Sequence, residues 1–176
     1  GDEIIALCER EAEITGSYVS LVERLIQDQR WEEAERWCRR GIEATEAVGS
    51  SGIGSDLRRK LRTISEQTGD YPRAAAFYAE EFFSHPGVQS FQMLCHAAEK
   101  AGVGLAVEAW ARRHLETGQI PPPASAQGEK RPGAPDGPWS LPNTGLPLKA
   151  RRQPSEGPMI SVLIALAIAE GNPDEV

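Results

Sequence analysis

Apolar residues recur at intervals of three and four along most of this chain, which is the spacing of an amphipathic helix. The alternation of apolar and polar residues that marks a strand is nearly absent, so the pattern predicts an all-α fold. About eight helices are expected, at residues 2–14, 17–28, 30–47, 56–68, 70–84, 88–101, 103–117 and 158–170.

Capping and turn residues set the ends of these predicted helices. Ser17 is a candidate N-cap for the helix that follows it. The glycine- and serine-rich run VGSSGIGSD at 48–56 predicts a loop, after which Ser55 or Asp56 caps the next helix. Pro72 suits the first turn of the helix that starts near residue 70.

Residues 118–157 differ from the rest of the chain because they are rich in proline and glycine. Such a composition cannot form a regular helix, so a long loop or linker is expected between the helices at 103–117 and 158–170. Its few large apolar side chains are candidates for pinning parts of the loop back onto the helical body; they are Trp139, Leu141, Leu146 and Leu148.

One pattern of small, aromatic and proline residues returns along the chain. Within residues 69–86, Ala74 is followed one helical turn later by Tyr78, and Pro86 closes the segment. A small residue lets two helices approach closely, and the aromatic residue fills the gap to the next helix. Equivalent positions elsewhere are Ala34 and Cys38, Ala106 and Trp110, and Val176 in an incomplete final unit.

This pattern resembles the tetratricopeptide repeat (TPR) family over about residues 17–117 and again at 158–176. The resemblance implies a right-handed α-solenoid of antiparallel helix pairs, in one TPR-like domain over residues 1–176. The repeat core would span 17–117, with an insert at 118–157 and a final helix at 158–170. The last repeat would be truncated, which predicts that the chain is a fragment of a longer protein.

A weaker resemblance concerns the run LIALAIAEGNPDEV, which follows the proline-rich insert, and the run WCRRGI at 37–42. Both are similar to the C-terminal helical region of bacterial SWIM zinc-finger proteins. The zinc motif of that family is absent from this chain, so no zinc ligand is carried over. This resemblance implies a bacterial source and a zinc motif elsewhere in a parent protein.

Charge and hydropathy narrow the class of function. Hydrophobic residues make up 40% and charged residues 26% of the chain, which is typical of a globular protein. The net charge of −7 argues against direct nucleic-acid binding, and the basic runs at 57–62 and 149–152 are expected to be solvated surface. The apolar run MISVLIALAIA at 159–169 is too short to span a membrane and predicts a buried helix.

The residues that could carry chemistry do not form a catalytic or metal-binding pattern. The 3 cysteines are far apart and form no CxxC, which predicts reduced, buried thiols in a cytoplasmic protein. Adjacent residues Cys95 and His96 point about 100° apart on a helix, so they do not form a nucleophile–base pair. The acidic residues at 32–35 favour a helix N-terminus. We therefore expect no catalytic, cofactor-binding or metal-binding residues, and no enzyme activity.

The function expected from the repeat resemblance is protein–protein interaction or scaffolding, in which a groove binds a peptide or a partner protein. First helices line the inner face in this family, and the corresponding residues are Arg58, Arg62, Ser65, Gln92 and His96. Arg58 and Arg62 replace the usual apolar residues and predict an anion or carboxylate clamp for a peptide, unless they simply face water.

An alternative hypothesis is a regulatory module of a larger nucleic-acid-binding zinc-finger protein. Such a module would make contacts with its own parent chain or with a protein partner. Under either hypothesis no direct nucleic-acid or membrane contact is expected.

Overall fold

The structure of this protein is a computed structural model. It describes residues 5, 7–8, 10–12, 17–48, 51–121, 139–146 and 158–171. These residues form helices, turns and irregular segments with no strand among them, so the predicted all-α class is confirmed for this part of the chain. The chain divides into two compact units, which we call unit 1 (Gly1–Asp70) and unit 2 (Tyr71–Val176). Each unit is described by itself.

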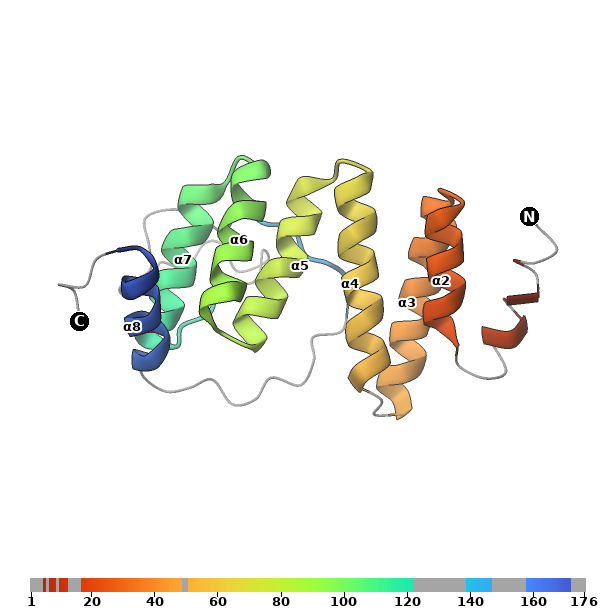
Figure 1. The fold of residues 1–176 in the computed structure, drawn as a ribbon, viewed down its shortest axis with the longest axis horizontal. Coiled ribbons are helices and arrows are strands. Elements are labelled where there is room, and N and C mark those ends of the chain that lie inside the picture. Colours follow the sequence, from red (N-terminus) through yellow and green to blue (C-terminus); the bar gives the residue numbers. More distant parts are fainter. Residues whose placement is uncertain are drawn as a thin grey trace. The chain divides into compact units, whose positions relative to one another are not determined.

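Unit 1 contains the helices α2 (Tyr18–Gln27), α3 (Trp31–Val48) and α4 (Ser51–Gln67), shown in orange to yellow in Figure 1. Helix α3 packs on both α2 and α4, and α2 also contacts α4. The core of this unit holds Leu21, Val22, Leu25, Ala34, Cys38, Ile42, Leu57 and Leu61, all almost fully buried.

Gly41 lies at the closest approach of the helices of unit 1. A Cβ atom at this position would be 2.6 Å from Leu57 Cδ1 and 2.9 Å from Tyr18 Cβ. Both distances are shorter than ordinary van der Waals contacts, so only glycine fits here without movement of α2 or α4. The sequence pattern did not single out this residue.

The predicted loop over 48–56 is wrong for residues 51–56, because α4 already begins at Ser51. Ser55 and Asp56 therefore lie inside the helix and do not cap it. The cause is tertiary packing: Gly54 is buried, and a Cβ at this position would be 3.3 Å from Thr45 Oγ1 on α3. A small residue here lets the first turns of α4 lie close against α3, despite their low helix propensity.

Ser17 occupies the predicted N-cap position of α2, but its side chain makes no capping hydrogen bond. The described residues of the predicted helix at 2–14 are helical, and Ile5 and Ala12 are buried. The other residues of that helix lie outside the described residues.

Unit 2 contains α5 (Tyr71–Ser84), α6 (Val88–Lys100), α7 (Gly104–Thr117) and α8 (Ile160–Ala169). Each helix packs on the next one along the chain, and α8 also contacts α6. Pro72 lies in the first turn of α5, as predicted. These four helices agree with the predicted ranges to within two residues at each end.

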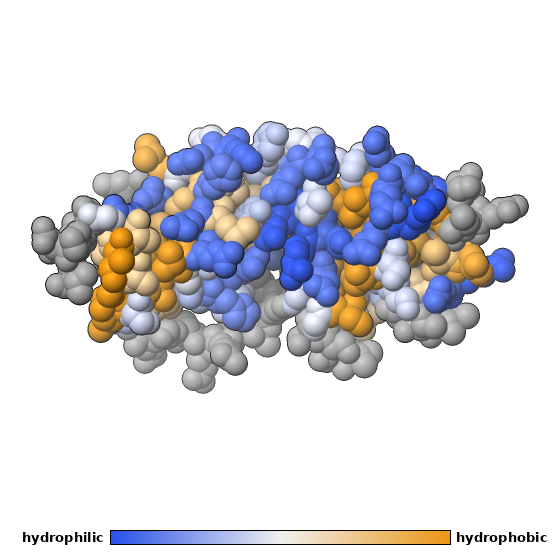
Figure 2. Space-filling view, in the orientation of Figure 1, coloured by the Kyte–Doolittle hydropathy of each residue, from blue (hydrophilic) through white to orange (hydrophobic). Residues whose placement is uncertain are grey.

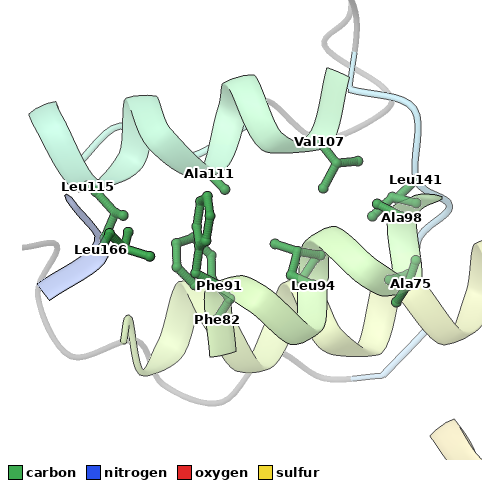
Figure 3. Close-up of a cluster of buried hydrophobic side chains, with 13 residues drawn as sticks. Ala75, Phe82, Phe91, Leu94, Ala98, Val107, Ala111, Leu115, Leu141 and Leu166 are labelled. Carbon is green, nitrogen blue, oxygen red and sulfur yellow. The ribbon is translucent and has the colours of Figure 1, made fainter. Parts of the chain in front are cut away.

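The core of unit 2 is apolar and centred on Phe82, which is fully buried (Figure 3). The Phe82 ring packs against the rings of Phe83, Phe91 and His114, with centroid separations of 5.2, 6.0 and 5.8 Å. The small residues of α5 and α6 in this cluster let the two helices lie close together; they are Ala75, Ala76, Ala79, Ala97 and Ala98.

Residues 139–146 of the proline-rich insert pack against unit 2. Leu141 is buried in its core, and Trp139 packs against the same cluster. Leu146 is also buried. The prediction that these side chains pin the insert back is therefore confirmed for Trp139 and Leu141, whereas Leu148 lies outside the described residues.

The residues that carry the repeat resemblance are divided between buried and half-buried positions. Ala34, Cys38, Ala74 and Trp110 are buried, whereas Tyr78, Pro86 and Ala106 are half-buried. The boundary between the two units falls at the turn that the repeat pattern places inside its second repeat. A single repeat domain over residues 1–176 stays a prediction, and Val176 lies outside the described residues.

Candidate functional site

Helix α8 is apolar on two opposite faces, because its sequence ISVLIALAIA contains only one polar residue. One face packs on the core of unit 2 through Met159, Val162, Leu163 and Leu166. The opposite face carries Ile160, Ile164 and Ile168, which follow one another at the four-residue spacing of a helical ridge. We call these three residues the isoleucine stripe.

The isoleucine stripe is exposed to solvent. The exposed fractions are 61% for Ile160, 37% for Ile164 and 65% for Ile168. Figure 2 shows hydrophobic residues gathered on the surface at α8. A helix that is apolar all round is normally buried on all sides. The stripe is therefore the strongest candidate for a binding surface among the described residues.

Contacts at both ends hold α8 in place. At its start, the backbone N–H of Met159 donates a hydrogen bond to the carbonyl oxygen of Leu115 on α7, at 2.7 Å. At its end, Arg112 on α7 donates from Nη2 to Glu170 Oε1 at 2.6 Å. Arg112 also donates from Nε to Glu108 at 2.9 Å, and its guanidinium lies 5.3 Å from the centre of the Phe91 ring.

The charge of Arg112 is secured by the same contacts. Burial acts to lower the pKa of Arg112, but its hydrogen bonds to Glu170 and Glu108 outweigh this effect and raise the pKa above its ordinary value. The guanidinium of Arg112 is therefore positively charged where it contacts Glu170 at the end of α8. The stripe is consequently presented on a helix whose two ends are fixed to α7.

The prediction that residues 159–169 form a buried helix is wrong for the stripe face. The core-facing side of α8 is covered, but Ile160 and Ile168 on the opposite side are 61% and 65% exposed. Within the part of the chain that the structure describes, no helix is both long and apolar enough to cross a membrane.

The predicted partner-binding residues fall in different environments. Ser65 is 3% exposed and its hydroxyl donates to the carbonyl oxygen of Leu61, so its side chain is not on the surface. Arg58 and Arg62, also in unit 1, are half-buried. Gln92 and His96 belong to unit 2 and are exposed one turn apart on α6. The two groups lie in separate units, and their joint role in a groove stays a prediction.

The cysteines are free thiols, but only Cys38 is buried, whereas Cys8 and Cys95 are half-buried. Burial is the main reason that the pKa of Cys38 is raised to about 12, with a smaller contribution from Glu35. Burial, and next the carboxylate of Glu108, raise the pKa of Cys95 to about 11. A thiol is nucleophilic as the thiolate, so both groups are unreactive at neutral pH.

We expect thiol reagents to modify Cys38 and Cys95 only slowly near pH 7 in the folded protein. Each folded-state pKa lies above 9.0, the ordinary pKa of a thiol, so both neutral thiols stabilise the fold fully below pH 9.0. This stabilisation is lost as the pH rises from there toward the folded-state values. Urea unfolding of a Cys38→Ala variant should therefore show a smaller fall in the free energy of unfolding between about pH 8 and 10 than the wild type.

Rapid labelling of Cys38 in the folded protein near pH 7, or the same pH dependence in the variant and the wild type, would contradict this expectation.

No group of three or more His, Cys, Asp or Glu side chains within the described ranges is arranged to hold a metal ion.

Comparison with known proteins finds no match: no family model, no curated protein and no solved structure is significantly similar to this chain. The resemblances to the tetratricopeptide repeat family and to the SWIM zinc-finger proteins therefore stay predictions. The candidate site rests on the residues and contacts described above.

Proposed function

We propose that this chain is a non-catalytic protein-interaction module, and that it binds a partner protein through the isoleucine stripe of α8. The observation that carries this proposal is the stripe itself, three exposed isoleucines on a helix fixed at both ends. Removing apolar surface from water is the main favourable contribution to protein association.

The partner surface that fits the stripe is an aliphatic face of a second helix. Next to the isoleucine ridge, the small residues Ser161, Ala165 and Ala169 form a furrow. Ridges of one helix pack into the furrows of another. No charged side chain lies within the stripe, which favours an aliphatic partner face. The stripe is about 12 Å long at a rise of 1.5 Å per residue, so a partner helix of about ten residues covers it.

The proposal includes the repeat architecture that the sequence predicts, a right-handed α-solenoid of antiparallel helix pairs. It is supported by the burial of the small repeat residues Ala34 and Ala74, and by the packing of consecutive helices within each unit. Such an array leaves an extended surface on which a partner can bind. The cytoplasmic location also stays a prediction.

The test is a variant with Ile160→Asp and Ile168→Lys. The negative charge is placed at the N-terminal end of α8 and the positive charge near its C-terminal end, where the helix dipole favours each. Both positions are largely exposed, so the free energy of unfolding should change by no more than about 0.5 kcal/mol. Partner binding should fall at least tenfold, because a charged residue would be buried at the interface. Binding is measured by quantitative co-purification from the source cells, followed by titration with the purified partner.

The matched control carries Gln92→Asp and His96→Lys, the same charges on exposed positions of α6. We expect this variant to bind like the wild type. If the α6 variant loses the partner and the α8 variant retains it, the surface that includes Gln92 and His96 is the binding site and the α8 proposal is wrong.

A further inference from the structure

The segment Trp139–Leu146 is irregular, yet it is attached to unit 2 by specific contacts. It contains no helix or strand, and its sequence WSLPNTGL is flanked by prolines at 138 and 147. Leu141 is 3% exposed and Leu146 is 8% exposed, although neither belongs to a regular element. An irregular segment that buries Leu141, Thr144 and Leu146 against a helical surface resembles a docked peptide.

Two side chains of the segment, Leu141 and Trp139, pack against the hydrophobic cluster of unit 2. Leu141 lies in the same buried cluster as Ala98 and Val107, where Figure 3 shows it beside α6. The Trp139 ring packs edge-on against Phe83 with a centroid separation of 5.7 Å. Phe83 itself packs against His114 at 5.0 Å, so the tryptophan joins an aromatic surface formed by α5 and α7.

A polar contact sets the register of the segment. The hydroxyl of Thr144 donates a hydrogen bond to the carboxylate of Glu80 on α5, and its oxygen also accepts one from the backbone N–H of Leu146. The backbone N–H of Gly145 donates to Asn143 Oδ1 at 2.8 Å, and Gly145 adopts a positive φ of 71°. The turn at Asn143–Gly145 thus presents the threonine hydroxyl to Glu80.

We infer that the surface of α5, α6 and α7 beneath this segment is a peptide-binding site, and that Trp139–Leu146 is its intramolecular occupant. The external ligand would be an extended segment of another protein with the same chemistry: an aromatic residue, a leucine two residues later, and a hydroxyl three residues after that. Because the segment belongs to the same chain, it competes with an external peptide as an intramolecular ligand. Partner binding at this surface therefore requires release of the segment. This inference concerns a surface other than the isoleucine stripe and does not depend on it.

The experiment uses a fluorescently labelled peptide of sequence PWSLPNTGLP, which corresponds to residues 138–147. It is titrated into the full chain and into a variant with Trp139→Ala and Leu141→Ser, in which the occupant has lost its two apolar anchors. Fluorescence anisotropy should show at least tenfold tighter binding to the variant than to the wild type. A peptide with serine in place of the leucine that corresponds to Leu141 should not bind to either protein.

The carboxylate contact is tested in the same assay. Adding Glu80→Gln to the variant should weaken binding of the labelled peptide, and replacing the peptide threonine by valine should then have little further effect. Equal peptide binding to the wild type and the variant would overturn the inference. So would no binding to a variant whose circular dichroism matches the wild type.

Hydrogen exchange on the wild-type chain tests the inference even if that variant fails to fold. The hydrogen-bonded amides of Gly145 and Leu146 should exchange through a local opening that leaves the amides of α6 protected. Excess unlabelled peptide should speed their exchange by occupying the vacated surface. Exchange of these amides only together with α6, with no effect of the peptide, would show that the segment is a permanent part of the core.

Discussion

A Gly41→Val variant is expected to lose much of the stability of unit 1. The first added carbon would lie 2.6 Å from Leu57 Cδ1 and 2.9 Å from Tyr18 Cβ. The Leu57 methyl group can rotate away, but the Tyr18 Cβ is fixed to the backbone of α2, so the helices must separate. Overpacking of this kind costs about 3 kcal/mol, a large part of the stability of a small domain. Urea unfolding followed by far-UV circular dichroism measures the loss.

Gly52→Ala is the matched control for this prediction. A Cβ at Gly52 would have no neighbour within 4 Å, and the residue is exposed on α4. Alanine reduces the freedom of the unfolded chain, so this change should raise the free energy of unfolding by about 0.5 kcal/mol. If Gly41→Val were as stable as the wild type, the close packing of α2, α3 and α4 would be refuted.

A Phe82→Ala variant is expected to destabilise unit 2 by about 4 kcal/mol, within the range for deleting a fully buried aromatic side chain. Phe82 is 0% exposed and contacts three other rings, Phe83, Phe91 and His114. Its removal leaves a cavity lined by rings that belong to α5, α6 and α7. These three helices therefore lose a shared contact, and the midpoint of thermal unfolding should fall markedly.

The control for this prediction is Tyr71→Ala, which removes a large aromatic side chain from the same helix. Tyr71 is 42% exposed, so the free energy of unfolding should fall by no more than about 0.5 kcal/mol. Equal losses from the two variants would show that Phe82 does not occupy the centre of the core.

Most of the helices could be predicted from the sequence because their apolar faces repeat cleanly. In α2 five residues, Tyr18, Leu21, Val22, Leu25 and Ile26, were expected on one face; the first four are buried and Ile26 is half-buried. The start of α4 could not be predicted in this way. Local propensity favours a loop at residues 51–56, but the close packing of Gly54 against Thr45 decides the outcome. Propensity is a weak guide where a tertiary contact opposes it.

The candidate site was harder to predict from the sequence than the helices. The run at 159–169 was correctly predicted as a helix, but its uniform hydropathy gave no indication of which face is covered. The four-residue spacing of Ile160, Ile164 and Ile168, opposite Val162 and Leu166, was a signal that could have identified a second apolar face. The pairing of Thr144 with Glu80 carries no such signal, because these residues are far apart in the chain.

Binding of a partner helix to the isoleucine stripe of α8 can be tested by site-specific cross-linking. A photoreactive phenylalanine analogue is placed separately at positions 160, 164 and 168, with position 96 on α6 as the control. After irradiation in the source cells, mass spectrometry identifies each cross-linked residue. We predict that all three stripe positions form adducts with the partner and that position 96 forms none. The cross-linked residues of the partner should lie on one helix, about four residues apart from one stripe position to the next. Adducts that are scattered over unrelated segments, absent from the stripe, or equally frequent from position 96 would contradict such binding. Adducts with α8 of a second copy of this chain would show that the stripe forms a homodimer and does not bind a different protein.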